Sequence, residues 1–146
     1  MQLPHDAVVL VADGRKMLFL RNEGDALNPN LTVEHAEEQA NPADREHTTD
    51  GAGRASSPQG AAQSSLGKAD AHQLEEDRFA ASAADLLKRR ALSNDFKQLI
   101  VIAPPRTLGE LRKHYHKEVS DRITGELAKD LTGHPIPDIE RAIVDA

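Results

Sequence analysis

The sequence predicts one domain of the mixed α/β class (an α+β mixed sheet), with four to five strands and flanking helices over residues 1–146. Two continuous apolar runs of strand length, Ala7–Ala12 and Gln98–Ala103, are typical of strands covered on both faces. Helical periodicity follows residue 70, so the expected order is β-β-β, a long loop, α-β-α, then β-α. A chain of 146 residues is long enough for one core and too short for two domains.

The first strands are predicted from apolar patterning and turn residues. Asp13-Gly14 is a strong turn signal after the first apolar run, so residues 7–21 are expected to form a hairpin. Leu31 and Val33 alternate with polar neighbours, which predicts a third, half-exposed strand within 27–35. Together these segments predict three consecutive strands at the start of the domain.

The segment 36–72 contains no Val, Ile, Met or Phe and only one Leu, Leu66. Such a segment buries too little apolar surface to offset its chain entropy, so we expect a long flexible loop over 36–72. A structureless stretch of this length within a small domain is usually either functional or disordered. We therefore expect the loop to become ordered against a partner.

The second half alternates helices with strands. Asp70 and Gln73 have capping-box spacing and predict a helix to about Leu92, and Thr107 and Glu110 predict a second helix through about His114. Over 119–131, helical and strand spacings both occur; we favour a short helix at 116–121 followed by an edge strand at 122–128. A final helix is expected over 138–144, after the two prolines that precede it.

Composition excludes several classes of function. The chain has no cysteine, which excludes disulfides, zinc–thiolate sites and thiol catalysis, and its net charge of −6 argues against a nonspecific DNA-binding coat. Aromatic residues make up only 3%, too few for a stacking platform for single-stranded nucleic acid. Phosphate-loop, His-Glu-x-x-His and Gly-x-Ser-x-Gly motifs are missing, so we expect no cofactor, no metal and no catalytic residue. Without a signal-peptide pattern at residues 1–6 or a long apolar segment, we expect a cytoplasmic protein that does not bind membranes.

Several short motifs together resemble the bacterial host attachment protein family (proteins required for attachment to host cells). The matching segments, in chain order, are Val11–Arg15, Thr49–Arg54, Arg78–Ala80, Ala103–Arg112 and Lys129–Thr132. That family is in turn similar to bacterial release-factor-like proteins and to the middle domain of archaeal and eukaryotic class-I peptide release factors. The resemblance implies a middle-domain-like fold and an association with translation.

The sequence departs from the release-factor pattern at the catalytic loop. In those release factors, the loop carries Gly-Gly-Gln, whereas here Gln59 is preceded by Ser57 and Pro58. A loop that enters a tight catalytic centre depends on the backbone freedom of glycine. This difference argues against peptidyl-tRNA hydrolysis by the release-factor mechanism.

Two groups of residues are predicted to bind a partner. The loop group combines glycines that free the backbone with an arginine suited to phosphate or carboxylate, and consists of Asp50, Gly51, Gly53, Arg54 and Gln59. The second group lies at strand–helix turns and on a basic face, and consists of Asp13, Arg15, Arg78, Pro105, Arg106, Gly109, Arg112 and Lys113. A helix N-terminus after a buried strand favours anions. For both groups the alternative remains open: an ordinary surface loop, a well-capped helix and solvated helix faces.

We therefore expect a noncatalytic binding module whose partner is the ribosome or structured RNA, with other proteins as further partners through the long loop. The resemblance also implies an indirect role in attachment to host cells. The alternative is a hydrolase that acts on an ester or phosphodiester, such as a peptidyl-tRNA-like substrate, through the loop 50–60. The oligomeric state stays open.

Overall fold

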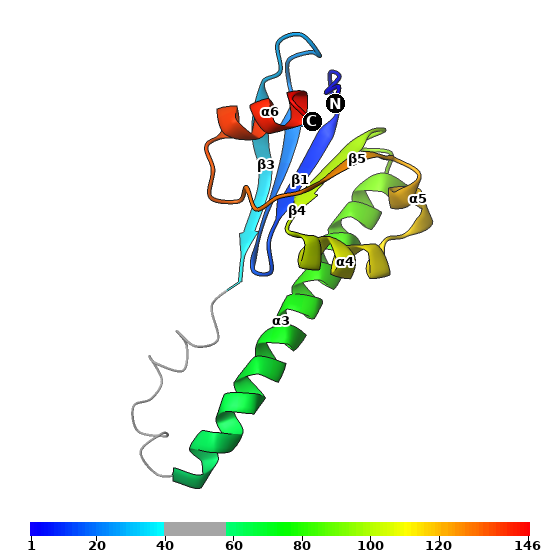
Figure 1. Ribbon diagram of the computed structural model, residues 1–146. Helices are drawn as coiled ribbons and strands as arrows, with labels where there is room; N and C mark the ends of the chain where they lie inside the picture. Colours follow the sequence, from blue (N-terminus) through cyan, green and yellow to red (C-terminus); the bar gives the residue numbers. More distant parts are fainter. Residues whose placement is uncertain (40–57) are drawn as a thin grey trace.

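The computed structural model describes the backbone of residues 1–39 and 58–146 and the side chains of residues 1–39 and 71–146. The strands are β1 (Val8–Ala12), β2 (Lys16–Asn22), β3 (Leu31–Glu38), β4 (Leu99–Ala103) and β5 (Ile123–Ala128). The helices are α3 (Pro58–Leu92), α4 (Pro105–His114), α5 (Lys117–Ser120) and α6 (Ile136–Val144). Figure 1 shows the sheet between α6 on one side and α3, α4 and α5 on the other. The predicted mixed α/β class is confirmed.

The sheet has five strands in the order β3-β2-β1-β4-β5. The hairpin predicted over 7–21 is confirmed, because β1 pairs antiparallel with β2, which pairs antiparallel with β3. On its other side β1 pairs parallel with β4, and β4 pairs parallel with β5. The two strands predicted from continuous apolar runs, β1 and β4, are the central parallel pair, and every residue in them is buried.

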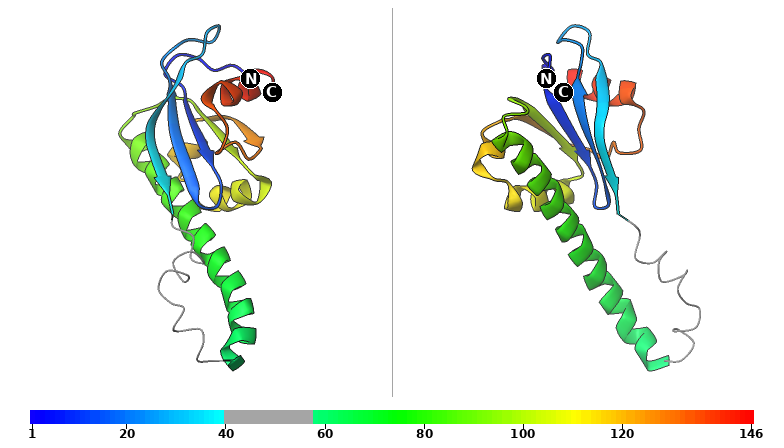
Figure 2. Two further views of the ribbon diagram at one scale, coloured as in Figure 1. Left: turned by 90° about the vertical axis from the view of Figure 1, so that its left-hand side faces the viewer. Right: turned by 180° about the vertical axis from the view of Figure 1, so that it is seen from behind.

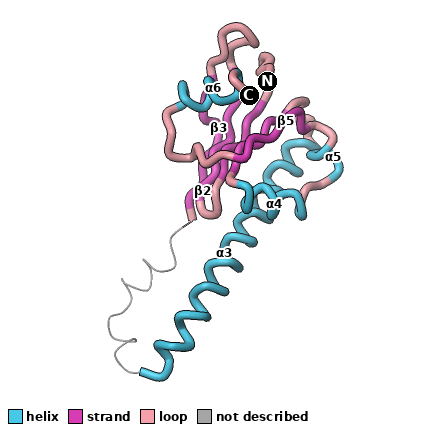
Figure 3. The backbone as a smooth tube through the Cα atoms, in the orientation of Figure 1, coloured by secondary structure: helices cyan, strands magenta, loops and turns pink. Residues whose placement is uncertain are grey.

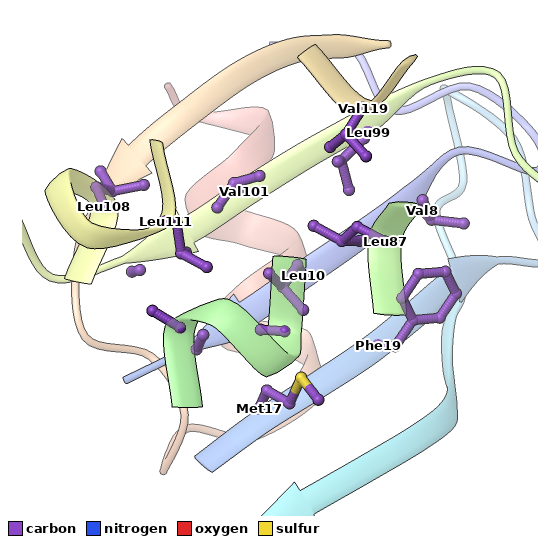
Figure 4. Packing of buried hydrophobic residues seen from close by; sticks show 14 of the residues in the cluster. Val8, Leu10, Met17, Phe19, Leu87, Leu99, Val101, Leu108, Leu111 and Val119 are labelled. Carbon is purple, nitrogen blue, oxygen red and sulfur yellow. The ribbon is translucent and has the colours of Figure 1, made fainter. Parts of the chain in front are cut away.

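Side chains of the central strands alternate between two apolar clusters because successive residues of a strand point to opposite faces. Val8 and Leu10 of β1 pack with α3, whereas Val9 and Val11 pack on the side of α6. Figure 4 shows the first cluster, in which Leu87 of α3 lies against the strand residues. Phe79, Ala83 and Leu87, which lie at helical spacing in the sequence, all belong to this cluster and form the buried face of α3.

The long helix α3 differs from the prediction at its start. It begins at Pro58, so residues 58–72 are helical rather than part of a loop, and Asp70 is not an N-cap. Its 35 residues span about 52 Å at 1.5 Å per residue, and its first turns extend past the end of the sheet (Figures 1 and 3). The prediction relied on apolar side chains, which indicate only where a helix is buried against a core. The helix starts earlier than this buried part, because a helix that has already formed gains an internal hydrogen bond for each residue added.

Two other element boundaries also differ from the prediction. The third strand runs over Leu31–Glu38 rather than within 27–35, so residues 36–38 are part of the sheet. Helix α4 begins at Pro105, with Pro104 as N-cap and no side-chain cap, so the capping box predicted at Thr107 and Glu110 is wrong. Proline suits the first helical position because its φ is already helical and it has no N–H to satisfy there.

The C-terminal elements agree with the preferred alternative. Over 119–131 the chain forms the short helix α5 and then β5, which is an edge strand. The final helix α6 starts at Ile136, two residues before the predicted boundary. Figure 2 shows α6 on the face of the sheet opposite α3. It covers that face through Ile139 and Ile143, which are fully buried.

An ion-pair network fixes the C-terminal end of α3 against the sheet. Arg21 of β2 contacts Glu34 and Asp95, each at 2.9 Å, and Arg90 of α3 lies 4.1 Å from the centre of the Phe19 ring. Burial alone would lower the pKa of Arg21, but its hydrogen bond to Glu34 and the surrounding carboxylates raise that pKa overall. The network therefore holds this end of α3 in place, and the opposite end of the helix extends beyond the sheet.

Candidate functional site

The motifs singled out in the sequence converge at one end of the sheet. Strands β1, β4 and β5 are parallel, so their carboxyl ends lie at the same edge. The residues that follow these ends are Asp13 after β1, Pro104 after β4 and Lys129 after β5. Helix α3 leaves the sheet on this side (Figure 1). In open α/β sheets this edge is where ligands tend to bind.

Asp13 organises the turn at the centre of this edge. Its Oδ1 accepts hydrogen bonds from the backbone N–H groups of Arg15 and Lys16, both at 2.7 Å. Its Oδ2 accepts a hydrogen bond of 2.8 Å from the hydroxyl of Thr132, which is only 7% exposed. The Thr132 hydroxyl also lies 3.2 Å from Asp130. Two motifs that are 119 residues apart in the sequence are thus joined by one buried hydroxyl group.

Helix α3 contacts the same turn. A Cβ atom on Gly14 would lie 2.8 Å from Cγ of Glu76, so the absence of a side chain lets the helix approach closely. Next to it, the backbone N–H of Gln39 donates to the carbonyl of Arg15 at 2.7 Å, and the Gln39 side chain donates to Glu75. These contacts fix the direction in which α3 leaves the sheet. From Phe79 onward the helix is packed in the core.

The start of α4 forms the second part of the edge. Pro105 and Arg106 are exposed, and a Cβ atom on Gly109 would meet no atom within 4 Å. Along the helix, Arg112 contacts Glu126 at 3.2 Å and Lys113 contacts Glu110 at 3.1 Å. Each of these two cations is therefore partly neutralised by its own neighbouring carboxylate.

The structure brings some of the predicted residues together and leaves others apart. Asp13, Arg15, Pro105 and Arg106 lie at the edge where the parallel strands end, and Arg78 is exposed on α3, 3.8 Å from Glu75. Arg112, Lys113 and Gly109 lie further along α4. The loop residues Asp50, Gly51, Gly53 and Arg54 lie outside the described residues. Gln59 lies in the first turn of α3, and its side chain is also outside the described part.

Sequence reasoning did not assign a role to Thr132, Asp130 or Glu76. Thr132 and Asp130 belong to a motif that carried the resemblance, and this was the one available signal. No sequence pattern indicated a role for Glu76, because a contact with a glycine 62 positions away leaves no periodic pattern. Within the described residues, no group of three or more His, Cys, Asp or Glu side chains is arranged to hold a metal ion. In the same part of the chain, none of the helices combines the length and apolar character needed to span a bilayer.

The motif residues thus gather at the end of a five-stranded sheet from which a long helix extends. Residues 6–143 match the family model described as bacterial archaeo-eukaryotic release factor family 12, and the chain therefore belongs to this family. This confirms the expected relation to bacterial release-factor-like proteins. The role in host attachment stays a prediction.

A curated relative gives no further functional information. An uncharacterized protein of Rickettsia prowazekii (strain Madrid E) is 33% identical to this chain over 72 residues. The match covers 48% of this chain and 48% of the relative, so it spans about half the length of each protein.

Proposed function

We propose that this protein is a noncatalytic, translation-associated module that binds the ribosome or structured RNA in the cytoplasm. Membership in a release-factor family over residues 6–143 supports a role in translation. The single observation that carries the proposal is the position of the motif residues, which gather at the end of the sheet from which α3 extends. A rigid domain with a long extending helix is suited to reach into a crevice of a large partner.

The exposed arginines at this edge are the residues that we assign to phosphate contacts. Arg15 follows the Asp13 turn and Arg106 lies in the first turn of α4, and both are exposed. Guanidinium groups bind phosphate oxygens, often through two parallel hydrogen bonds. In the proposal, Arg54 and the other loop residues add further contacts to the same partner.

The test is sedimentation of the intact protein with ribosomes on sucrose gradients at low salt, with and without RNase. We expect the wild-type protein in ribosomal fractions and a shift to the top of the gradient for the double variant Arg15→Glu, Arg106→Glu. The matched control is Lys88→Glu, Lys97→Glu, which makes the same charge change at exposed positions away from this edge and should leave sedimentation unchanged. Absence of the wild-type protein from every ribosomal fraction would refute the proposal.

The hydrolase alternative stays a prediction with its own test. It assigns chemistry to the loop 50–60, for which Arg54 and Gln59 are the residues to replace. If the wild-type protein hydrolyses neither peptidyl-tRNA nor a phosphodiester, this alternative is wrong. If it hydrolyses one of them and the separate variants Arg54→Ala and Gln59→Ala retain full activity, the assignment of the chemistry to the loop 50–60 is wrong. The predicted indirect role in attachment to host cells is tested by deletion of the gene together with an attachment assay.

A further inference from the structure

The outer side of β3 is a free sheet edge within the described part of the chain, since β3 is the outermost strand and pairs there only with β2. The backbone N–H of Gln39 donates to Arg15, and the register continues with Glu38, Glu37 and Ala36. Alternate residues of an antiparallel pair face their partner strand. The amide groups of Ala36 and Glu38 therefore point away from β2, where another strand is able to bind them.

A groove runs between this edge and helix α3. It has a volume of about 570 Å³ and is lined by Glu37, Glu38, Gln39, Arg78, Phe79 and Ser82. The wall from β3 supplies carboxylates, and Phe79 adds an apolar ring. The β-bulge between the pairs of Phe19 and Leu20 interrupts the ladder further up the strand, so the regular part of the edge lies beside this groove.

The charge of this edge selects the kind of partner. Glu37 and Glu38 lie on the groove, and Glu75 of α3 is adjacent to it through its contact with Gln39. The cation of the groove, Arg78, is 3.8 Å from Glu75, and Lys16 of β2 lies opposite Glu38 in the register, so three carboxylates face two cations along this edge. Phosphate groups are repelled by such an edge, whereas lysine and arginine side chains are attracted to it.

We propose that the outer edge of β3 and its groove bind an extended, lysine- and arginine-rich segment of a partner protein, which adds a sixth strand to the sheet. Main-chain hydrogen bonds to Ala36 and Glu38 provide the affinity. Basic side chains on the α3 side of the added strand reach Glu37, and those on its other face reach Glu38. This site takes a protein rather than RNA and lies on the side of α3 that faces β3. It goes beyond the proposed function and does not depend on it.

The probe is the peptide Lys-Thr-Lys-Thr-Lys-Thr-Lys, added to the ¹⁵N-labelled intact protein and followed by amide chemical shifts. We expect shifts concentrated at 35–39 and 75–82. A peptide of the same sequence that is N-methylated at alternate residues keeps the charge but loses backbone donors, and it should bind at least about fivefold more weakly. The peptide Glu-Thr-Glu-Thr-Glu-Thr-Glu should not bind.

Two variants separate backbone pairing from charge. Ala36→Pro removes the outward N–H of an edge strand, a place where proline is tolerated, and should weaken binding of the lysine peptide by about fivefold or more. The double variant Glu37→Gln, Glu38→Gln should weaken it and reduce its salt dependence. Equal binding of the N-methylated peptide, shifts scattered over the surface, or displacement of the peptide by oligouridylate would each overturn the proposal.

Discussion

Replacement of Thr132 by valine tests the convergence of the two motifs at the candidate site. Valine has nearly the shape of threonine but lacks the hydroxyl that donates to Asp13 at 2.8 Å. A hydrogen bond to a charged acceptor contributes about 1.5–3 kcal/mol. Since Asp13 is only half-buried and water replaces part of the lost bond, we expect the variant to lose about 1–1.5 kcal/mol of stability.

The assay is urea unfolding at neutral pH. For a slope of about 2 kcal/mol per molar urea, the midpoint should fall by about 0.5–0.8 M with an unchanged slope. Thr132→Ser is the matched control, because it keeps the hydroxyl and removes one methyl group, at a cost of less than about 1 kcal/mol. A valine variant that loses less than about 0.5 kcal/mol would contradict the reasoning.

Double-mutant cycles show which carboxylate accepts the hydrogen bond of the Thr132 hydroxyl. The Thr132 hydroxyl has one proton to donate, and Asp13 is closer to it than Asp130, at 2.8 Å against 3.2 Å. Combining the valine variant with Asp13→Ala should give a coupling energy of about 1 kcal/mol, whereas the cycle with Asp130→Ala should give about zero. A larger coupling energy for Asp130 than for Asp13 would show that the assignment of the hydrogen bond to Asp13 is wrong.

Three further predictions concern other parts of the fold. Burial, together with the charge of Glu126, raises the pKa of Tyr115. Absorbance titration of this one tyrosine should therefore show its hydroxyl still protonated at pH 10. Because the tyrosine of the unfolded chain ionises at lower pH than that of the folded protein, the free energy of unfolding should fall as the pH rises above about 10. His116 accepts the backbone N–H of Glu118 as N-cap of α5, so His116→Ala should lower the free energy of unfolding by about 1 kcal/mol and His116→Asn by less, measured in urea. Gly24→Ala would place a Cβ atom against the backbone oxygen of Asn28, so calorimetry should show a loss of about 2 kcal/mol or more; an unchanged melting temperature would contradict this.

The candidate site was only partly accessible from sequence. Arg106 was identified as a cation beside a helix N-terminus, and Arg15 as part of a motif that carried the resemblance; the structure places both at one edge. Thr132 and Glu76 were not assigned roles, because each acts through a contact with a residue far away in the sequence. The prediction for the loop group, from Asp50 to Arg54, lies outside the described residues and stays a prediction.

The sequence by itself determined the fold class, the hairpin, the two central strands and the apolar face of α3. These features depend on local periodicity: the runs at β1 and β4, and the spacing of Phe79, Ala83 and Leu87, repeat at intervals set by strand and helix geometry. Only the tertiary structure decided the strand order β3-β2-β1-β4-β5 and the meeting of Asp13 with Thr132. It also decided the start of α3 at Pro58, because pairings between distant segments and the length of a helix beyond its packed part leave no periodic mark on the chain.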